Sequence, residues 1–468
     1  MKRIAFIIVL FTTVLHADVT VVRDGKVEAV IVVPDRFASE AKLPATRLSH
    51  ESLTVPLAAA ELADYLSKSG GTRPEIVAES KAPESGMKSR LFVGPCKATL
   101  ALLKENPLAE ELIVRTRGED LHLIGGDLSV GGMPCRGTLY AVYDFLEREI
   151  GVRWLFPGEL GEVVPRHRDL VLPAIDRRER PRIEKRKIRN QALTREDTFA
   201  PLLESWGITV EAWKAAHPEA VYGPWFSRMR LGMRVDIDGG HAYSGWWEKY
   251  GNAHPEWFAL QPDGTRTQKP VRERLCKSNP ALWDEIARVK IEEFRANPKL
   301  LTASICPNDG GANQFCVCEA CRALDQPGGT TASLSDRVFT FYNEIATRVA
   351  REMPDRGLVA YAYSVYRDPP VRVRALSPNL IVGFVGLDQS SIEAWSRIAP
   401  KLYIRPNDLG PVIDLGMPRN HAAHLAQSVK FAAEHKAIGF DFGRIDPVYD
   451  KGYFRFLQGL DVGIGFSF

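Results

Sequence analysis

The sequence predicts an α/β protein in which a small α/β N-terminal domain is followed by a TIM-type (β/α)8 barrel. The chain of 468 residues is longer than one ordinary core, so more than one domain is expected. Its first part mixes short strand-like and helical runs, whereas from residue 187 onward a β-rich run followed by a helical run recurs eight times. A content of 45% hydrophobic and 25% charged residues is ordinary for a globular protein.

The first 17 residues are typical of a secretory signal peptide. Lys2 and Arg3 precede an apolar run at residues 4–15, and the small residue Ala17 ends the segment. A membrane anchor or a buried strand is the alternative, but the run is short for a membrane span and no second long apolar run follows. We therefore expect a secreted or periplasmic protein that has no membrane span once the signal is removed.

Residues 18–170 predict the N-terminal α/β domain. Residues 19–33 alternate around the Asp24-Gly25 turn, as in a hairpin, and residues 55–68 have helical spacing. A second amphipathic helix is expected at residues 137–150, before Gly151. Residues 171–186, which contain much of a dense charge run, predict a solvated linker.

Residues 187–468 predict the barrel. The predicted strands are residues 187–192, 233–238, 257–261 or 274–278, 301–306, 358–364, 380–386, 401–405 and 437–442. Between them, helices are expected at 280–296, 335–353, 391–398 and 420–435, the first capped by Asn279 and started by Pro280. Because the chain ends soon after the last strand, we expect a truncated final helix.

Carboxylates follow several predicted strands, where the reactive groups of such barrels gather. They are Asp238, Asp309, Asp388, Asp408 and, within the last strand, Asp441. Hydrolysis of a glycosidic bond needs one carboxylic acid to protonate the leaving oxygen and a second carboxylate as nucleophile or base. Since Asp followed by Gly is also a common turn, Asp238 and Asp309 have a purely structural alternative.

Aromatic and polar side chains near these carboxylates are candidates for binding a sugar. The predicted substrate-binding residues are His241, Tyr243, Trp246, Trp247, Asn308, Tyr361, Tyr363 and Asp441. Packing between helices is the alternative for the tryptophans, and a satisfied structural histidine is the alternative for His241.

Three of the seven cysteines, Cys316, Cys318 and Cys321, lie within six residues. With Cys306 or Cys276 as a fourth thiol they predict either a structural zinc site or a disulfide, and the spacing does not choose between these. A catalytic zinc is less favoured, because three thiolates leave a poor Lewis acid.

Charge and missing motifs exclude other classes. The 61 basic and 58 acidic residues leave a net charge of +3, so neither a nucleic-acid partner nor a membrane-surface partner is expected. Neither a Gly-x-Gly-x-x-Gly or P-loop fingerprint nor a Gly-x-Ser-x-Gly elbow occurs in the sequence. We expect a carbohydrate substrate and no cofactor.

Several segments resemble known families. The sequences GTLYAVYDFLE at 137–147, GVRWLFPG at 151–158 and GEVVP at 161–165 resemble the end of the N-terminal domain of alpha-glucuronidases and hexosaminidases. His254-Pro-Glu-Trp257-Phe and Pro307-Asn-Asp309-Gly, with the three clustered cysteines, resemble the bacterial family called domain of unknown function 4838.

The resemblance implies a glycosidase-like activity. Carried over by strand position from the alpha-glucuronidases, the acid falls on Asp309, where those enzymes have a Glu, and the water-activating carboxylates fall on Asp388 and Asp408. The Asp-Glu pair of hexosaminidases is missing beside Asp309. The leading hypothesis is an exported glycoside hydrolase, and the alternative is a non-catalytic glycan-binding protein on the same fold.

Overall fold

The computed structural model forms two compact units, each considered by itself. The first unit contains residues 1–128, 136–153 and 162–180, and the second contains residues 129–135, 154–161 and 181–468. The structure describes residues 18–45, 48, 54–155, 158–188, 200, 204, 207, 209–212, 219–237, 239–266, 274–309, 312–325, 333–406 and 422–442. The predicted signal peptide lies outside these residues. Among them, no helix is long and apolar enough to cross a membrane.

The first unit is built on a six-stranded mixed sheet with the order β11-β6-β7-β5-β3-β4. The strands are β3 (Val30–Val33), β4 (Ile76–Ala78), β5 (Arg90–Val93), β6 (Leu112–Arg117), β7 (Asp120–Gly125) and β11 (Asp176–Glu179). A smaller sheet contains β10 (Leu170–Leu172), β1 (Val19–Arg23) and β2 (Lys26–Val27), and the last two form the predicted hairpin. The short strands β8 (Arg153–Trp154) and β9 (Glu162–Val163) follow.

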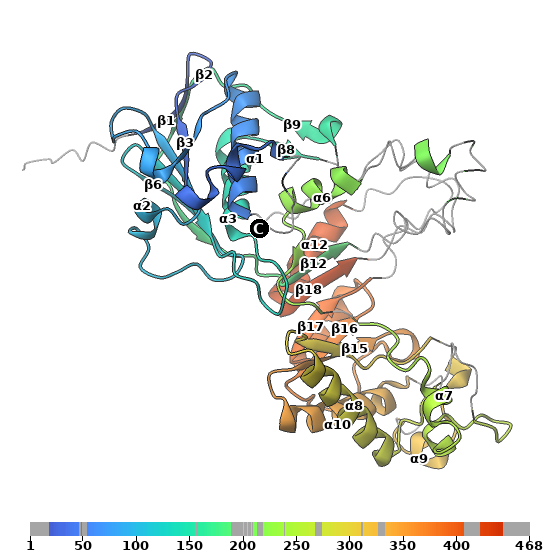
Figure 1. Ribbon diagram of the computed structural model, residues 1–468. Coiled ribbons are helices and arrows are strands. Elements are labelled where there is room, and N and C mark those ends of the chain that lie inside the picture. Colours follow the sequence, from blue (N-terminus) through green and yellow to red (C-terminus); the bar gives the residue numbers. More distant parts are fainter. Residues whose placement is uncertain are drawn as a thin grey trace, which may run out of the picture. The chain divides into compact units, whose positions relative to one another are not determined.

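Two helices, α1 (Thr54–Gly70) and α3 (Gly137–Phe145), pack on the larger sheet and against each other (Figure 1). Alanine and leucine occupy seven of the 17 positions of α1, and most of that helix is buried. After α3 one π-helical turn, Leu146–Ile150, ends at Gly151, whose positive φ of 84° gives the expected glycine stop. A short helix, α2 (Lys97–Leu100), follows β5.

Half of the predicted linker is strand. β10 pairs with β1, and β11 pairs antiparallel with β6. The charge run is paired within the first unit, since Arg177 forms ion pairs with Asp144 and Glu149, and Arg178 with Glu111. A segment that supplies an edge strand and partly buried ion pairs is not a solvated connector, which corrects the prediction.

The second unit contains a seven-stranded sheet with the order β13-β12-β18-β17-β16-β15-β14. The strands are β12 (Lys185–Ile188), β13 (Gly232–Met233), β14 (Thr302–Ser304), β15 (Gly357–Ala362), β16 (Leu380–Phe384), β17 (Lys401–Ile404) and β18 (Ala437–Phe442). From β12 through β18 to β14 all neighbours pair in parallel, and only β13 runs antiparallel to its partner. Strands with this pairing gather their carboxyl ends at one edge.

Helices cover the outside of this sheet. The longest are α8 (Pro280–Ala296) and α10 (Ser335–Glu352), which pack side by side near β15 (Figure 1). Asn279 caps α8 by accepting a hydrogen bond of 3.3 Å from the backbone of Leu282, as predicted. Among the described residues, further helices of the unit are α6 (Glu219–Arg228), α7 (Trp246–Tyr250), α9 (Glu319–Arg322), α11 (Gln389–Ile398) and α12 (Ala422–Glu434).

The α/β class is confirmed, but the described strands form a half-barrel sheet and not a complete ring of eight. The predicted strand at 233–238 is reduced to the antiparallel β13. Residues 257–261 and 274–278 contribute only an isolated antiparallel bridge between Phe258 and Leu275. The two alternatives for the third strand are therefore the two sides of one small loop structure.

A buried ion pair lies within the parallel sheet. The Lys185 ammonium lies 3.1 Å from an oxygen of Asp441, with side chains 0% and 1% exposed. Lys185 also donates to the carbonyl oxygen of Ile237 and lies 5.1 Å from the centre of the Tyr403 ring. The pair links β12 to β18 and leaves Asp441 far from solvent.

Candidate functional site

The strongest candidate site lies at the carboxyl end of β14. Residues 239–243 run beside residues 304–308, because His241 forms a parallel bridge with Cys306 and Ala242 donates 3.1 Å to the Cys306 carbonyl. Ser304 supports this alignment through hydrogen bonds between its hydroxyl and the backbone of Gly240. Two adjacent extended segments therefore end together and present their side chains at one edge.

His241 and Asp309 meet at this edge. The Nε2 atom of His241 lies 3.2 Å from Oδ2 of Asp309, and the two side chains are 47% and 69% exposed. On the other side of the ring, Nδ1 lies 3.0 Å from the carbonyl oxygen of Pro307. Since a carbonyl only accepts, Nδ1 carries a hydrogen. The contact of Nε2 with Asp309 is an ion pair when the imidazole carries a proton on both nitrogens.

The buried side chain of Asn308 connects residues 304–308 to residues 239–243. Its side chain is 2% exposed, and its oxygen accepts a hydrogen bond of 3.2 Å from the backbone of Tyr243. This contact orients the amide, so its nitrogen is a donor, and that donor has no partner among the described residues. A buried donor without a partner costs roughly 1–3 kcal/mol. Asn308 thus holds the Asp309 loop at an energetic cost.

Tyr361 and Tyr363 come from the end of β15 and the residues after it. The Tyr361 hydroxyl donates to the carbonyl of Gly239, and its ring occupies the space that a Cβ at Gly239 would need. The guanidinium of Arg405, which follows β17, lies 4.6 Å from the Tyr361 ring centre. Tyr361 is 7% exposed and Tyr363 is half-buried, so neither ring is fully accessible to a sugar.

Asp388 caps a helix and pairs with an arginine. One of its oxygens caps α11 by accepting 3.1 Å from the backbone of Ser391, and the other accepts from Arg367. Burial opposes its ionisation, but the hydrogen bonds from Ser391 and the charge of Arg367 outweigh burial, so the pKa of Asp388 is lowered. Both oxygens are engaged and the group stays ionised. Asp388 is therefore not proposed as the water-activating base.

The remaining predicted carboxylates lie elsewhere. Asp441 is the buried partner of Lys185, which corrects its predicted role as a substrate contact. Asp408 and Asp238 lie outside the described residues.

The aromatic residues after residue 241 lie in the core. Tyr243 is fully buried, donates 3.0 Å to the Ile305 carbonyl, and packs edge-on against Trp246, which is 8% exposed. Trp247 is half-buried and packs edge-on against Phe258. Tyr243 and Trp246 therefore offer no exposed face to a sugar, and the alternative of structural packing describes them correctly.

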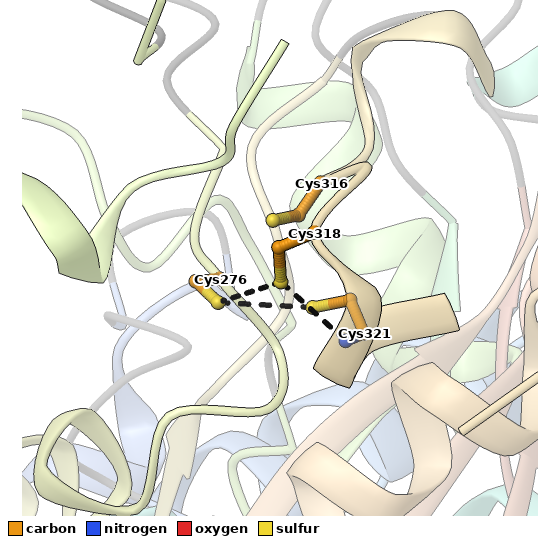
Figure 2. A group of neighbouring side chains, drawn as sticks. All are labelled: Cys276, Cys316, Cys318 and Cys321. Atoms are coloured by element: carbon orange, nitrogen blue, oxygen red, sulfur yellow. Dashed lines mark hydrogen bonds between the residues drawn. The ribbon is translucent and has the colours of Figure 1, made fainter. Parts of the chain in front are cut away.

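Four cysteines converge on one point in the loops beyond β14 (Figure 2). They are Cys276, Cys316, Cys318 and Cys321, and all four sulfurs lie within 4.8 Å of one another. Cys276 is the fourth member. Cys306, the other candidate, is buried in the sheet with its sulfur 3.5 Å from the Val359 carbonyl, which corrects its place in the predicted site.

Hydrogen bonds between the thiols favour the thiolate form of Cys276. Hydrogen bonds from Cys316 and Cys321 lower the pKa of Cys276, and this bonding raises that of Cys321. Beside them lies Lys277, whose ammonium is buried 3.9 Å from the centre of the Phe341 ring. Burial lowers the pKa of Lys277 to about 7, although the neighbouring cysteines oppose this shift.

Three basic residues that contact the candidate site residues were not predicted from the sequence. Arg367 and Arg405 follow strands without a motif, and Lys185 lay in the predicted linker. The only available signal was their position, since each is a basic residue at an end of a β-rich run. Cys276 was weighed as a fourth thiol, but its distance along the chain gave no preference over Cys306.

Residues 156–444, more than half of the chain, match the model of the family described as Domain of unknown function (DUF4838). The chain belongs to this family, which confirms the predicted resemblance. No curated protein matches the sequence.

Three similar solved structures share little sequence with this chain. A chitobiase of Flavobacterium johnsoniae shares 12% identity over 92% of this chain and 64% of its own, with a TM-score of 0.42. A 4-O-methyl-alpha-glucuronidase of family GH115, BtGH115A, shares 10% over 95% and 57%, with a TM-score of 0.43. A beta-N-acetylhexosaminidase of Bacteroides fragilis shares 12% over 92% and 83%, with a TM-score of 0.38. At these values the similarity identifies neither a substrate nor a site residue.

Proposed function

We propose that this chain is a glycoside hydrolase in which Asp309, paired with His241, donates the proton to the leaving oxygen. The observation that carries the proposal is the contact of 3.2 Å between the His241 imidazole and the Asp309 carboxyl group at the exposed carboxyl edge of β14. In this proposal a proton lies between the two groups, since the Pro307 carbonyl engages the other ring nitrogen. A general acid must carry a proton and be accessible to the substrate, and the proposed pair meets both requirements.

His241 acts in this proposal as the positioning residue. Its Nδ1 contact with the Pro307 carbonyl fixes the ring, so Nε2 faces Asp309 in a defined orientation. Asn308 holds the backbone of the same loop through Tyr243. The carboxyl group is thus placed by two neighbouring contacts, and its exposure leaves room for a saccharide oxygen.

Glycosidic hydrolysis also needs a second carboxylate, as nucleophile or base. Asp388 and Asp441 are committed to a helix cap and to a buried ion pair. Asp408, expected from the resemblance to alpha-glucuronidases, remains the proposed base. A separation of about 5 Å from Asp309 would imply retention of configuration, and one of about 6.5–9.5 Å would imply inversion. The proposal includes export of the chain and a poly- or oligosaccharide substrate.

The experiment is a screen of the purified mature chain against a panel of plant, algal and host polysaccharides, with release of reducing ends as the readout. On the substrate found, Asp309→Asn should lose activity by about 10²–10⁴-fold, the usual contribution of general acid catalysis. Asp355→Asn is the matched control, because its side chain is also 69% exposed but precedes β15, at the opposite end of the strand. Its activity should be unchanged.

The rival hypothesis, a glycan-binding protein, predicts a different result. The engagement of Asp388 favours it, because a binding protein needs no acid and base pair. Saturable binding of an oligosaccharide without product, and the same affinity in Asp309→Asn, would replace the hydrolase proposal.

A further inference from the structure

We propose that Cys276, Cys316, Cys318 and Cys321 bind one zinc ion in a closed tetrahedral site that fixes the loops beyond β14. The proposal goes beyond the glycosidase function and does not depend on it.

The geometry of the four sulfurs fits one ion. The sulfur of Cys276 lies 3.7 Å from that of Cys321 and 3.9 Å from that of Cys318. A zinc–sulfur bond of about 2.3 Å in a tetrahedron places its sulfurs about 3.8 Å apart. The four sulfurs therefore surround a common centre, as Figure 2 shows. In two disulfides they would instead pair off at about 2.05 Å.

The surrounding hydrogen bonds favour thiolates. The backbone of Leu260 donates 3.3 Å to the sulfur of Cys316, and the backbone of Cys321 donates 3.4 Å to that of Cys318. The Ser278 hydroxyl lies 3.2 Å from the sulfur of Cys321. Such outer contacts orient metal ligands and stabilise their negative charge.

Buried positive charge beside the cluster supports the zinc site independently of the distances between the sulfurs. Lys277 is 1% exposed, and its ammonium has no hydrogen-bond partner among the described residues. Arg274 is also buried, with its guanidinium 4.5 Å from the centre of the Phe315 ring. Buried cations normally lie near opposite charge. Four thiolates around Zn²⁺ carry a net charge of −2, which would place negative charge beside the Lys277 ammonium.

The chemistry of the site indicates a structural role. Four sulfur ligands fill the tetrahedron, so no position is left for water or substrate. The ligands come from two segments, residues 274–278 and 315–322, and a third segment joins them, because Val317 donates 2.9 Å to the Leu260 carbonyl. Asp309 precedes Cys316 in the loop after β14. The zinc would thus restrain the end of the loop that begins at the candidate acid.

The test is the metal content of the full chain, produced in medium containing zinc and purified without chelator. Mass spectrometry of the elements should find one zinc per chain. Thiol titration of the unfolded chain with a chelator should find all seven cysteines reduced. Cobalt, exchanged for zinc, should give the intense visible absorption of a tetrahedral thiolate site.

Cys276→Ser and Cys318→Ser should reduce the bound zinc at least tenfold. Cys306→Ser and Cys96→Ser should retain one equivalent, because these buried thiols lie outside the cluster. If a ligand variant fails to fold, the wild-type measurements still decide. Seven free thiols without metal, a disulfide within the quartet, or one iron in place of zinc would each overturn the proposal.

Discussion

At the scale of single residues, hydrogen-bonding capacity separates one aspartate from the others. Asp388 accepts from a backbone amide and from Arg367, which together outweigh burial and lower its pKa, and Asp441 is the buried partner of Lys185. Asp309 instead faces an imidazole whose other nitrogen is already a donor. Among these three carboxylates, Asp309 is the exposed one that lies beside an imidazole, which makes it the proposed acid.

His122 on β7 predicts a dependence of stability on pH in the first unit. It is 3% exposed, stacks on Phe92 and shares a hydrogen bond of 3.0 Å with Thr99. Burial lowers its pKa from 6.5 to about 4, against a smaller opposing effect of Asp120. The unfolded chain therefore binds a proton that the folded unit resists. Its contribution is complete above pH 6.5 and is lost as the pH falls toward 4, by about 3 kcal/mol in all.

Hydrogen exchange of the β7 amides, followed between pH 7 and pH 4 and corrected for intrinsic rates, measures this loss. The free energy of opening should fall less steeply in His122→Asn, which keeps an acceptor for Thr99 but does not titrate. Equal slopes in both proteins would contradict the assignment of the neutral imidazole to the folded state.

At the scale of elements, β12 and β18 are linked by charge as well as by backbone. Lys185 and Asp441 are both fully buried, so removal of one partner leaves the other as an uncompensated charge. We expect Asp441→Asn to destabilise the second unit by about 3–5 kcal/mol. Urea unfolding of wild type and variant gives this difference.

A double substitution provides the control for that experiment. Lys185→Met with Asp441→Leu removes both charges, and its cost should be smaller than the sum of the single changes. A loss below about 1 kcal/mol in Asp441→Asn would show that the pair is solvated and that β12 and β18 are held by backbone pairing alone.

At the scale of the whole molecule, local patterns predicted the regular elements well. Helix α8 has the predicted bounds because Asn279 and Pro280 mark its start in any context. Strand β18 also has its predicted bounds. By contrast, residues 176–179 were assigned to a linker, since a run of charges conceals a strand whose arginines pair with acids far along the chain. Long-range pairing leaves no local signal.

The candidate site shows the same division. Asp309 and His241 were selected because they follow β-rich runs, and the structure brings them together. The core packing of Tyr243 and Trp246, and the choice of Cys276 over Cys306, depend on contacts between distant segments. An aromatic residue beside a predicted site has the same local sequence whether it faces a ligand or the core.

The account as a whole depends on Asp309 acting as the proton donor, and leaving-group dependence tests this most directly. On the substrate found in the screen, kcat/KM is measured for wild type and Asp309→Asn with the natural linkage and with an activated aryl glycoside of the same sugar. An acid is needed only where the leaving oxygen is basic. The account predicts a loss of about 10²–10⁴-fold on the natural linkage and a loss at least tenfold smaller on the aryl glycoside. Equal losses on both substrates, or no loss on either, would contradict it.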